Sequence, residues 1–202
     1  MKILLTIGLV QLLAVISPGP SFLITARTAV SRSRLDGVKV ALGLGAGTII
    51  WASLAVLGLH VVFEAVPQLK AAMQFASAGF LIWIAVMIFR HAKLPLDLEG
   101  AVAGPNPFWQ GFITQVSNPK VVVFFGSIFI AMLPHEVPFS LSLGLIAVVT
   151  FNELWWYSAV ALFFGSGPVR AFYLKAKAWI DRVTAVFLGF LGLKLAWGAI
   201  QS

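Results

Sequence analysis

Apolar residues occur along this chain in long runs, and polar or charged residues are confined to short stretches between the runs. A run of about 20 apolar residues has the length of a helix that crosses a lipid bilayer. The runs predict six helical segments, at residues 3–26, 40–63, 71–89, 112–133, 139–164 and 183–200. The pattern therefore predicts an all-α membrane protein with six transmembrane helices.

The composition supports this class of protein. Hydrophobic residues make up 60% of the chain and charged residues only 10%, whereas soluble domains carry about 25% charged residues. The net charge of +7 would indicate nucleic acid in a soluble protein, but here the expected partner is the lipid bilayer. The chain has no cysteine, and His60, His91 and His135 lie far apart. We therefore expect no metal site and no cofactor.

Lysine and arginine residues in the loops predict the orientation, because they accumulate on the cytoplasmic side. The odd-numbered loops carry ten of them: Arg27, Arg32, Arg34, Lys39, Arg90, Lys93, Arg170, Lys175, Lys177 and Arg182. The other side carries Lys2 and Lys70. We therefore expect the odd-numbered loops to lie in the cytoplasm and both termini to lie on the other side of the membrane. Two alternatives are a cleaved signal peptide at residues 3–26 and a five-span protein with a cytoplasmic N-terminus.

Two of the six segments contain proline where a helix would otherwise continue. The first holds "SPGPS" at 17–21 and the fourth holds "SNPK" at 117–120. Each proline lacks an N–H group and crowds the carbonyl four residues earlier. A freed carbonyl in hydrocarbon costs several kcal/mol unless protein or water satisfies it. We therefore expect two helix breaks inside the membrane, although proline also occurs in membrane helices as an ordinary kink.

The two breaks occupy corresponding places in the two halves of the chain. The stretches "QLLAVISPGPSFLI" (11–24) and "TQVSNPKVVVFF" (114–125) share an order of glutamine, apolar residues, serine and proline. The linker 91–107 separates residues 1–90 from residues 108–202, with three predicted spans in each half. The prediction is a single transporter domain, 1–202, built from two inverted three-helix repeats. Such repeats with matching broken helices are typical of secondary transporters.

A broken helix presents N–H groups on one side of the break and carbonyls on the other. Amides suit a carboxylate and carbonyls suit an ammonium, so two facing breaks can hold a zwitterion. The residues that we expect to bind such a substrate are Ser17, Pro18, Gly19, Pro20, Ser21, Asn118, Pro119, Lys120 and Asn152.

Glu153 is the carboxylate that lies well inside a predicted span. Ionisable groups there cost at least about 2.5 kcal/mol and are functional by default, so Glu153 is the candidate for proton coupling; the alternative is a structural glutamate. Its neighbour Asn152 points about 100° away on a helix, so both line one cavity only if the helix is irregular. Lys120 is expected to meet a carboxylate or to pair with Glu153; the alternative is snorkelling to the cytoplasmic interface.

The second segment carries a row of small residues, Gly43, Gly45 and Gly47, followed by Gly58. Small residues allow the close approach of two membrane helices. The row therefore predicts close packing within the chain, and a homodimer is its alternative use.

Three motifs together resemble the LysE/RhtB family of bacterial amino-acid exporters: "SPGPSFL" (17–23), "GLGAGTIIW" (43–51) and "NPK" (118–120). The stretches "TAVSRSR" (28–34) and "LGLH" (57–60) are most similar to the family members that export threonine. The resemblance runs from about Leu12 to the C-terminus. It implies an inner-membrane exporter of small neutral amino acids driven by the proton gradient. The family usually has Asp or Asn after Pro-Gly-Pro, and this chain has Ser21.

Other functions fit the sequence less well. A divalent-cation exporter would need clustered acidic, histidine or cysteine ligands in the membrane, and one glutamate falls short. An intramembrane hydrolase would need a nucleophile with a base or paired aspartates, and no HExxH motif is present. We therefore expect a transporter and not an enzyme.

Overall fold

The computed structural model describes residues 2–65, 69–96, 98, 106–133, 137–164 and 166–201. Regular structure in these residues is entirely helical, in eight helices: α1 (Lys2–Ile16), α2 (Pro20–Ser31), α3 (Arg34–Ala65), α4 (Leu69–His91), α5 (Pro107–Val116), α6 (Pro119–Met132), α7 (Phe139–Phe163) and α8 (Gly167–Gln201). His135, the side chain of His60 and residues 97 and 99–105 of the linker lie outside the described residues.

Each predicted segment corresponds to one helix or to one interrupted pair of helices. The predicted breaks are confirmed. Residues 17–19 separate α1 from α2, which is bent away by 53°, and Ser117 with Asn118 separates α5 from α6. The four other segments are the single helices α3, α4, α7 and α8.

The prediction for the last segment is wrong at its N-terminal end. Helix α8 begins at Gly167 and not at Val183, so the stretch that we expected to be the fifth loop is helical and carries Asp181 inside a helix. Residues 171–182 contain four charged residues among short apolar stretches, and a search for continuous apolar runs misses an amphipathic helix of this kind. The Gly-Pro pair at 167–168 is the start signal for this helix.

Proline begins helices in this fold instead of bending them. Pro20, Pro107 and Pro119 are each the first residue of a helix, where the missing N–H has no intrahelical acceptor to lose. Asn106 caps α5 by accepting from the N–H of Phe108 at 3.0 Å. Asn118 caps α6 in the same way, accepting from the N–H of Lys120 at 3.0 Å. The Asn-Pro pairs therefore specify where both halves of the fourth segment start.

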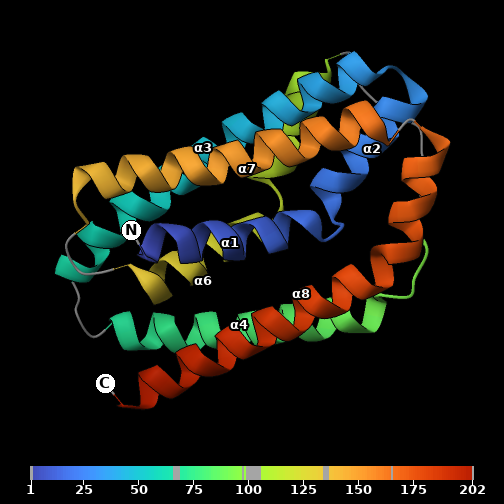
Figure 1. Ribbon diagram of the computed structural model, residues 1–202. Coiled ribbons are helices and arrows are strands. Elements are labelled where there is room, and N and C mark those ends of the chain that lie inside the picture. The colour runs from blue at the N-terminus through green and yellow to red at the C-terminus, as the bar shows by residue number, and fades with distance from the viewer. Residues whose placement is uncertain are drawn as a thin grey trace.

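The helices form three layers (Figure 1). Helices α3 and α7 pack together on one side with α2 and α5, helices α1 and α6 lie in the middle, and α4 packs along α8 on the other side. The ends of α2, α4 and α7 and the starts of α3, α5 and α8 lie at one end of the bundle, at the right of Figure 1. The start of α1 and the end of α8 lie at the opposite end.

The glycine row of α3 is used for packing within the chain, as we expected. A Cβ atom on Gly43 would overlap the carbonyl oxygen of Phe108 in α5, and one on Gly111 would overlap the carbonyl oxygen of Val40. A Cβ atom on Gly47 would lie 2.8 Å from Cβ of Gln115. Contact this close between α3 and α5 fixes the position of Gln115 relative to α3.

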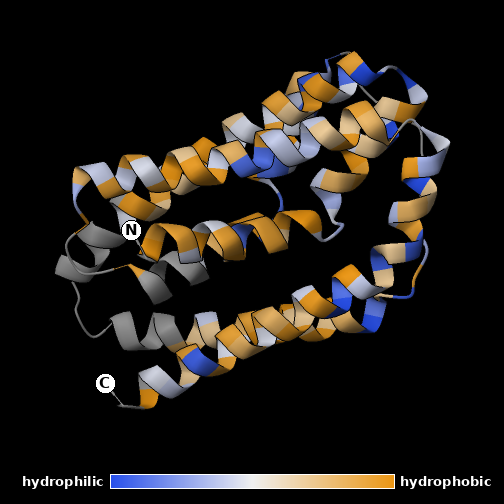
Figure 2. Ribbon diagram, viewed as in Figure 1, coloured by the Kyte–Doolittle hydropathy of each residue, from blue (hydrophilic) through white to orange (hydrophobic). Residues whose placement is uncertain are grey.

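The outer surface of the bundle is apolar. Large apolar side chains exposed on it include Leu5, Leu9, Trp83, Phe151, Trp179, Val186, Phe190 and Trp197. Figure 2 shows hydrophobic residues along the lengths of the helices and hydrophilic ones at the end that carries the α2–α3 turn. Helices α3 and α7 are long and apolar enough to cross a membrane, and the bent pair α1 and α2 passes as a third span. An apolar exterior of this extent marks a membrane-facing surface.

Candidate functional site

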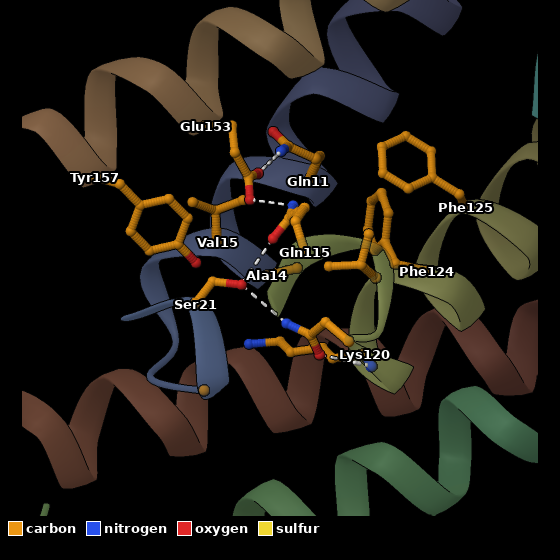
Figure 3. A pocket seen from close by; sticks show the side chains of 13 residues that line it. Gln11, Ala14, Val15, Ser21, Gln115, Lys120, Phe124, Phe125, Glu153 and Tyr157 are labelled. Carbon is orange, nitrogen blue, oxygen red and sulfur yellow. Dashed lines mark hydrogen bonds between the residues drawn. The ribbon is translucent and has the colours of Figure 1, made fainter. Parts of the chain in front are cut away.

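A small cavity lies between the two helix breaks (Figure 3). Helix α1 contributes Gln11, Ala14 and Val15, the first break Gly19, and α2 Ser21. The remaining lining comes from Gln115, Asn118, Lys120, Val121, Phe124 and Phe125 of the fourth segment and from Glu153 and Tyr157 of α7. Its volume of about 30 Å³ is room for about two water molecules.

The carboxylate of Glu153 lies at one end of this cavity, with 3% of the residue exposed. Nε2 of Gln11 donates to its Oε2 atom at 2.9 Å, and Nε2 of Gln115 donates to its Oε1 atom. Each oxygen thus accepts from an amide, which suits an ionised carboxylate. Hydrogen bonds to charged groups contribute about 1.5–3 kcal/mol each, which offsets part of the cost of burying the charge.

The two glutamines come from the two halves of the chain and are held in similar ways. Gln11 also donates to the carbonyl of Val149 at 3.2 Å and accepts from Asn152 at 2.8 Å. Gln115 also donates to the hydroxyl of Thr48 at 2.8 Å. Both N–H groups of each amide are therefore in use, so each glutamine is fixed in orientation.

A chain of hydrogen bonds connects Glu153 to both breaks (Figure 3). The hydroxyl of Ser21 donates to Oε1 of Gln115 at 2.7 Å and accepts from Nδ2 of Asn118 at 2.9 Å. Ser21 is the second residue of α2, just after the first break, and Asn118 lies in the second break, where it caps α6. The carboxylate, the two amides and the hydroxyl therefore form one buried polar network.

Protein groups satisfy several carbonyls at the first break. The hydroxyl of Tyr173 donates to the carbonyl of Ile16 at 3.0 Å, and Nζ of Lys120 donates to the carbonyl of Ser17 at 2.9 Å. The hydroxyl of Thr184 lies 3.4 Å from the carbonyl of Leu13. At the second break, the carbonyl of Gln115 accepts from the N–H of Asn118 at 3.3 Å. These contacts give hydrogen-bond donors to backbone carbonyls at the breaks, which an interrupted helix requires where no water is available.

Nine of the ten predicted site residues fall into three groups. Gly19, Ser21, Asn118, Lys120 and Glu153 line the cavity between the breaks. Ser17 and Pro18 line a second cavity against α8, while Pro20 and Pro119 are exposed at the starts of their helices.

Asn152 lines neither of these two cavities. Helix α7 is a continuous helix through this region, and Nδ2 of Asn152 donates to Gln11 and to the carbonyl of Gly8 at 3.0 Å. It therefore holds Gln11, the residue that contacts Glu153. Lys120 reaches the first break, where its Nζ donates to the carbonyl of Ser17 at 2.9 Å.

Sequence reasoning missed the two glutamines as partners of Glu153, and with them Thr48 and Tyr157. The signal was present in the aligned stretches 11–24 and 114–125, since each includes a glutamine shortly before its break. It also missed Asp181, which is 4% exposed and pairs with Lys177 at 2.9 Å, because this part of α8 was predicted to be a loop.

The site offers hydrogen-bond donors, acceptors and two opposite charges, Glu153 and Lys120, in an enclosed space. Across the described parts of the chain, no group of three or more acidic, histidine or cysteine residues is placed to hold a metal ion. The arrangement suits reversible binding of a small polar solute and a proton.

These features define a helical membrane transport protein, in which interrupted helices meet around a buried carboxylate. The chain belongs to the LysE type translocator family, which it matches over residues 12–198. It is thus an integral membrane protein of a translocator family.

Among its relatives, the threonine efflux protein of Salmonella typhimurium is 33% identical over 198 residues, which cover 94% of this chain and 96% of the relative. The threonine efflux protein of Escherichia coli K12 is 32% identical over 201 residues, with 94% and 96% covered. An uncharacterized membrane protein of Haemophilus influenzae is 24% identical over 205 residues, which cover 98% of this chain and 98% of the relative. No solved structure matches the chain.

Proposed function

We propose that this protein exports small neutral amino acids, of which threonine and homoserine are the expected examples, across the bacterial inner membrane in exchange for protons. The observation that carries the proposal is the polar network that joins both helix breaks to Glu153. Membership of a translocator family and the similarity to two threonine efflux proteins support the choice of substrate.

The proposed architecture is six transmembrane spans in two inverted repeats, with both termini in the periplasm. The alternation of helix ends between the two ends of the bundle supports it (Figure 1). The packing of the two repeats also supports it. Helix α3 lies against α7, and these are the second spans of the two repeats; α4 lies against α8, and these are the third spans. In this arrangement the two breaks lie beside one cavity.

In the proposed binding mode, the substrate occupies an enlarged form of the cavity between the breaks. Its carboxylate would accept from Ser21, Asn118 and Lys120, and its ammonium would approach Glu153. The present volume of about 30 Å³ holds water and not an amino acid. Binding therefore requires the helices around the cavity to separate, as alternating access demands.

The hydrogen-bond network suggests how a proton and the substrate are coupled. A protonated Glu153 has an O–H group that needs an acceptor, while Gln115 offers it an N–H group. If the side-chain amide of Gln115 rotates so that its oxygen and nitrogen exchange places, the oxygen accepts from Glu153 and the nitrogen faces Ser21. A protonated Glu153 offers the substrate ammonium no negative charge, so the proton and the substrate bind in turn, as exchange for protons requires.

A divalent-cation exporter is the alternative within the same superfamily, and the ligand groups present in the described residues do not favour it. An enzymatic role finds no support in a translocator family.

Export from reconstituted vesicles tests the proposed function. Vesicles are loaded with one radiolabelled amino acid at a time, over all twenty, and efflux is followed with and without a pH gradient. We expect gradient-stimulated efflux of threonine and of similarly small neutral amino acids, and none from vesicles without protein. Gradient-independent leakage of all twenty, or efflux of divalent cations alone, would contradict the proposal.

A further inference from the structure

A second cavity lies on the other side of the first break, and its volume is about 300 Å³. Ser17 and Pro18 form one wall, and Lys177 and Asp181 of α8 form another. The remaining lining is Met87, Ile88, His91, Leu94, Pro95 and Leu96, at the end of α4 and just after it. This volume is at the lower end of the range of small-molecule sites, and it is ten times that of the cavity beside Glu153.

The polar groups of this cavity include Ser17, His91 and a buried pair of opposite charges. Nζ of Lys177 lies 2.9 Å from Oδ2 of Asp181, and the two residues are 7% and 4% exposed. Lys177 also donates to the carbonyl of Ala92 at 3.0 Å. A buried ion pair gives little net stability compared with apolar residues of the same size, so its stability alone does not account for its presence.

Asp181 contacts the broken helix directly. The hydroxyl of Ser17 donates to Oδ1 of Asp181 at 3.1 Å, while the carbonyl of the same serine accepts from Lys120 at 2.9 Å. Ser17 therefore lies between the two cavities, with Asp181 on one side and Lys120 on the other. A cationic group that binds Asp181 competes with Ser17 and acts on the break itself.

We propose that this second cavity is the loading site for the zwitterionic amino acid, occupied before the substrate reaches the cavity beside Glu153. The substrate ammonium replaces the Ser17 hydroxyl at Asp181, and the substrate carboxylate meets Lys177. The apolar walls formed by Met87, Ile88 and Leu96 admit an uncharged side chain. This inference rests on the proposed export function and adds a separate binding site to it.

Protection of a single cysteine from alkylation tests the site, because the chain contains no cysteine of its own. Leu94 lines the cavity and is 54% exposed, whereas Phe89 is 52% exposed but does not line it. Leu94→Cys and Phe89→Cys are made in the full-length protein, reconstituted in nanodiscs and treated with a maleimide. L-threonine, and each of the other nineteen amino acids singly, is added at saturating concentration.

We expect L-threonine to slow alkylation of Leu94→Cys several-fold and to leave Phe89→Cys unchanged. Asp181→Asn with Lys177→Gln keeps hydrogen-bonding groups in place but removes both charges. In the Leu94→Cys background this pair should abolish protection and weaken threonine binding by at least about tenfold, as expected for the loss of charged hydrogen bonds. Should that variant unfold, Ile88→Trp replaces it, since it fills the cavity without touching the charges.

Two results overturn the loading site while leaving the export function in place. The first is that the protein exports threonine along a pH gradient while none of the twenty amino acids slows the alkylation of Leu94→Cys. The other is unchanged protection in the charge-free variant. Failure of the unmodified protein to export any of the twenty amino acids would instead overturn the proposed function.

Discussion

The contact between Gly47 of α3 and Gln115 of α5 makes the orientation of Gln115 sensitive to a single methyl group. In Gly47→Ala, the new Cβ atom would lie 2.8 Å from Cβ and 3.0 Å from Cγ of Gln115. Carbon atoms in contact are normally about 3.5–4.0 Å apart, so Gln115 must move by about 1 Å. A displacement of this size disrupts the geometry of the bonds of Gln115 to Ser21 and Thr48, which are now 2.7 and 2.8 Å long.

We expect Gly47→Ala to destabilise the protein by about 1–3 kcal/mol, the usual cost of overpacking, and to reduce threonine export by more than tenfold. Gly58→Ala is the control on the same helix, because a Cβ atom there meets no atom of the described residues within 4 Å. Alanine in place of a helical glycine stabilises by about 0.5–1 kcal/mol. Thermal unfolding in detergent and efflux from loaded vesicles measure the two effects. Equal stability and equal export for the two variants would refute the reasoning.

Three further predictions concern the first break, the glutamine pair and the topology. Gly19→Ala should export normally, since its Cβ atom meets Lys120 Cδ at an ordinary 3.6 Å. Gly19→Leu should be folded and inactive, because its side chain enters the cavity, and normal export by this variant would contradict the prediction. Gln11→Leu should lower export at least tenfold and lower stability, because Glu153 loses one donor; an unchanged efflux rate would show that the donor is dispensable. A membrane-impermeant maleimide should label Ser202→Cys in intact spheroplasts and Ser33→Cys only after permeabilisation, and the reverse pattern would invert the proposed topology.

The positions of the helix breaks were predictable from sequence because proline acts locally. A missing N–H and a ring that clashes with the preceding turn exclude a continuous helix whatever surrounds them. Pro20 and Pro119 therefore begin new helices as the sequence indicated. The apolar runs were equally informative, since the length of a bilayer-spanning helix is a property of the bilayer.

The partners of Glu153 were not predictable in the same way. Gln11, Gln115 and Thr48 come from three different helices, and their meeting depends on how closely α3 and α5 pack. Nothing in a run of apolar residues shows which polar side chain faces inward. Asp181 was missed for a different reason, because it lies in an amphipathic part of α8 where charged residues are frequent enough to resemble a loop.

The central claim is that Glu153 couples proton movement to amino-acid export, and Glu153→Gln tests it most directly. Glutamine keeps the shape of the protonated side chain but cannot release a proton. In vesicles with saturating threonine on both sides, we expect this variant still to exchange labelled for unlabelled threonine, because the new amide oxygen accepts a hydrogen bond from the substrate ammonium. When a pH gradient is imposed against a threonine gradient, the unmodified protein should drive uphill export and the variant should drive none. Full gradient-driven export by Glu153→Gln would contradict the account and leave Glu153 with a structural role.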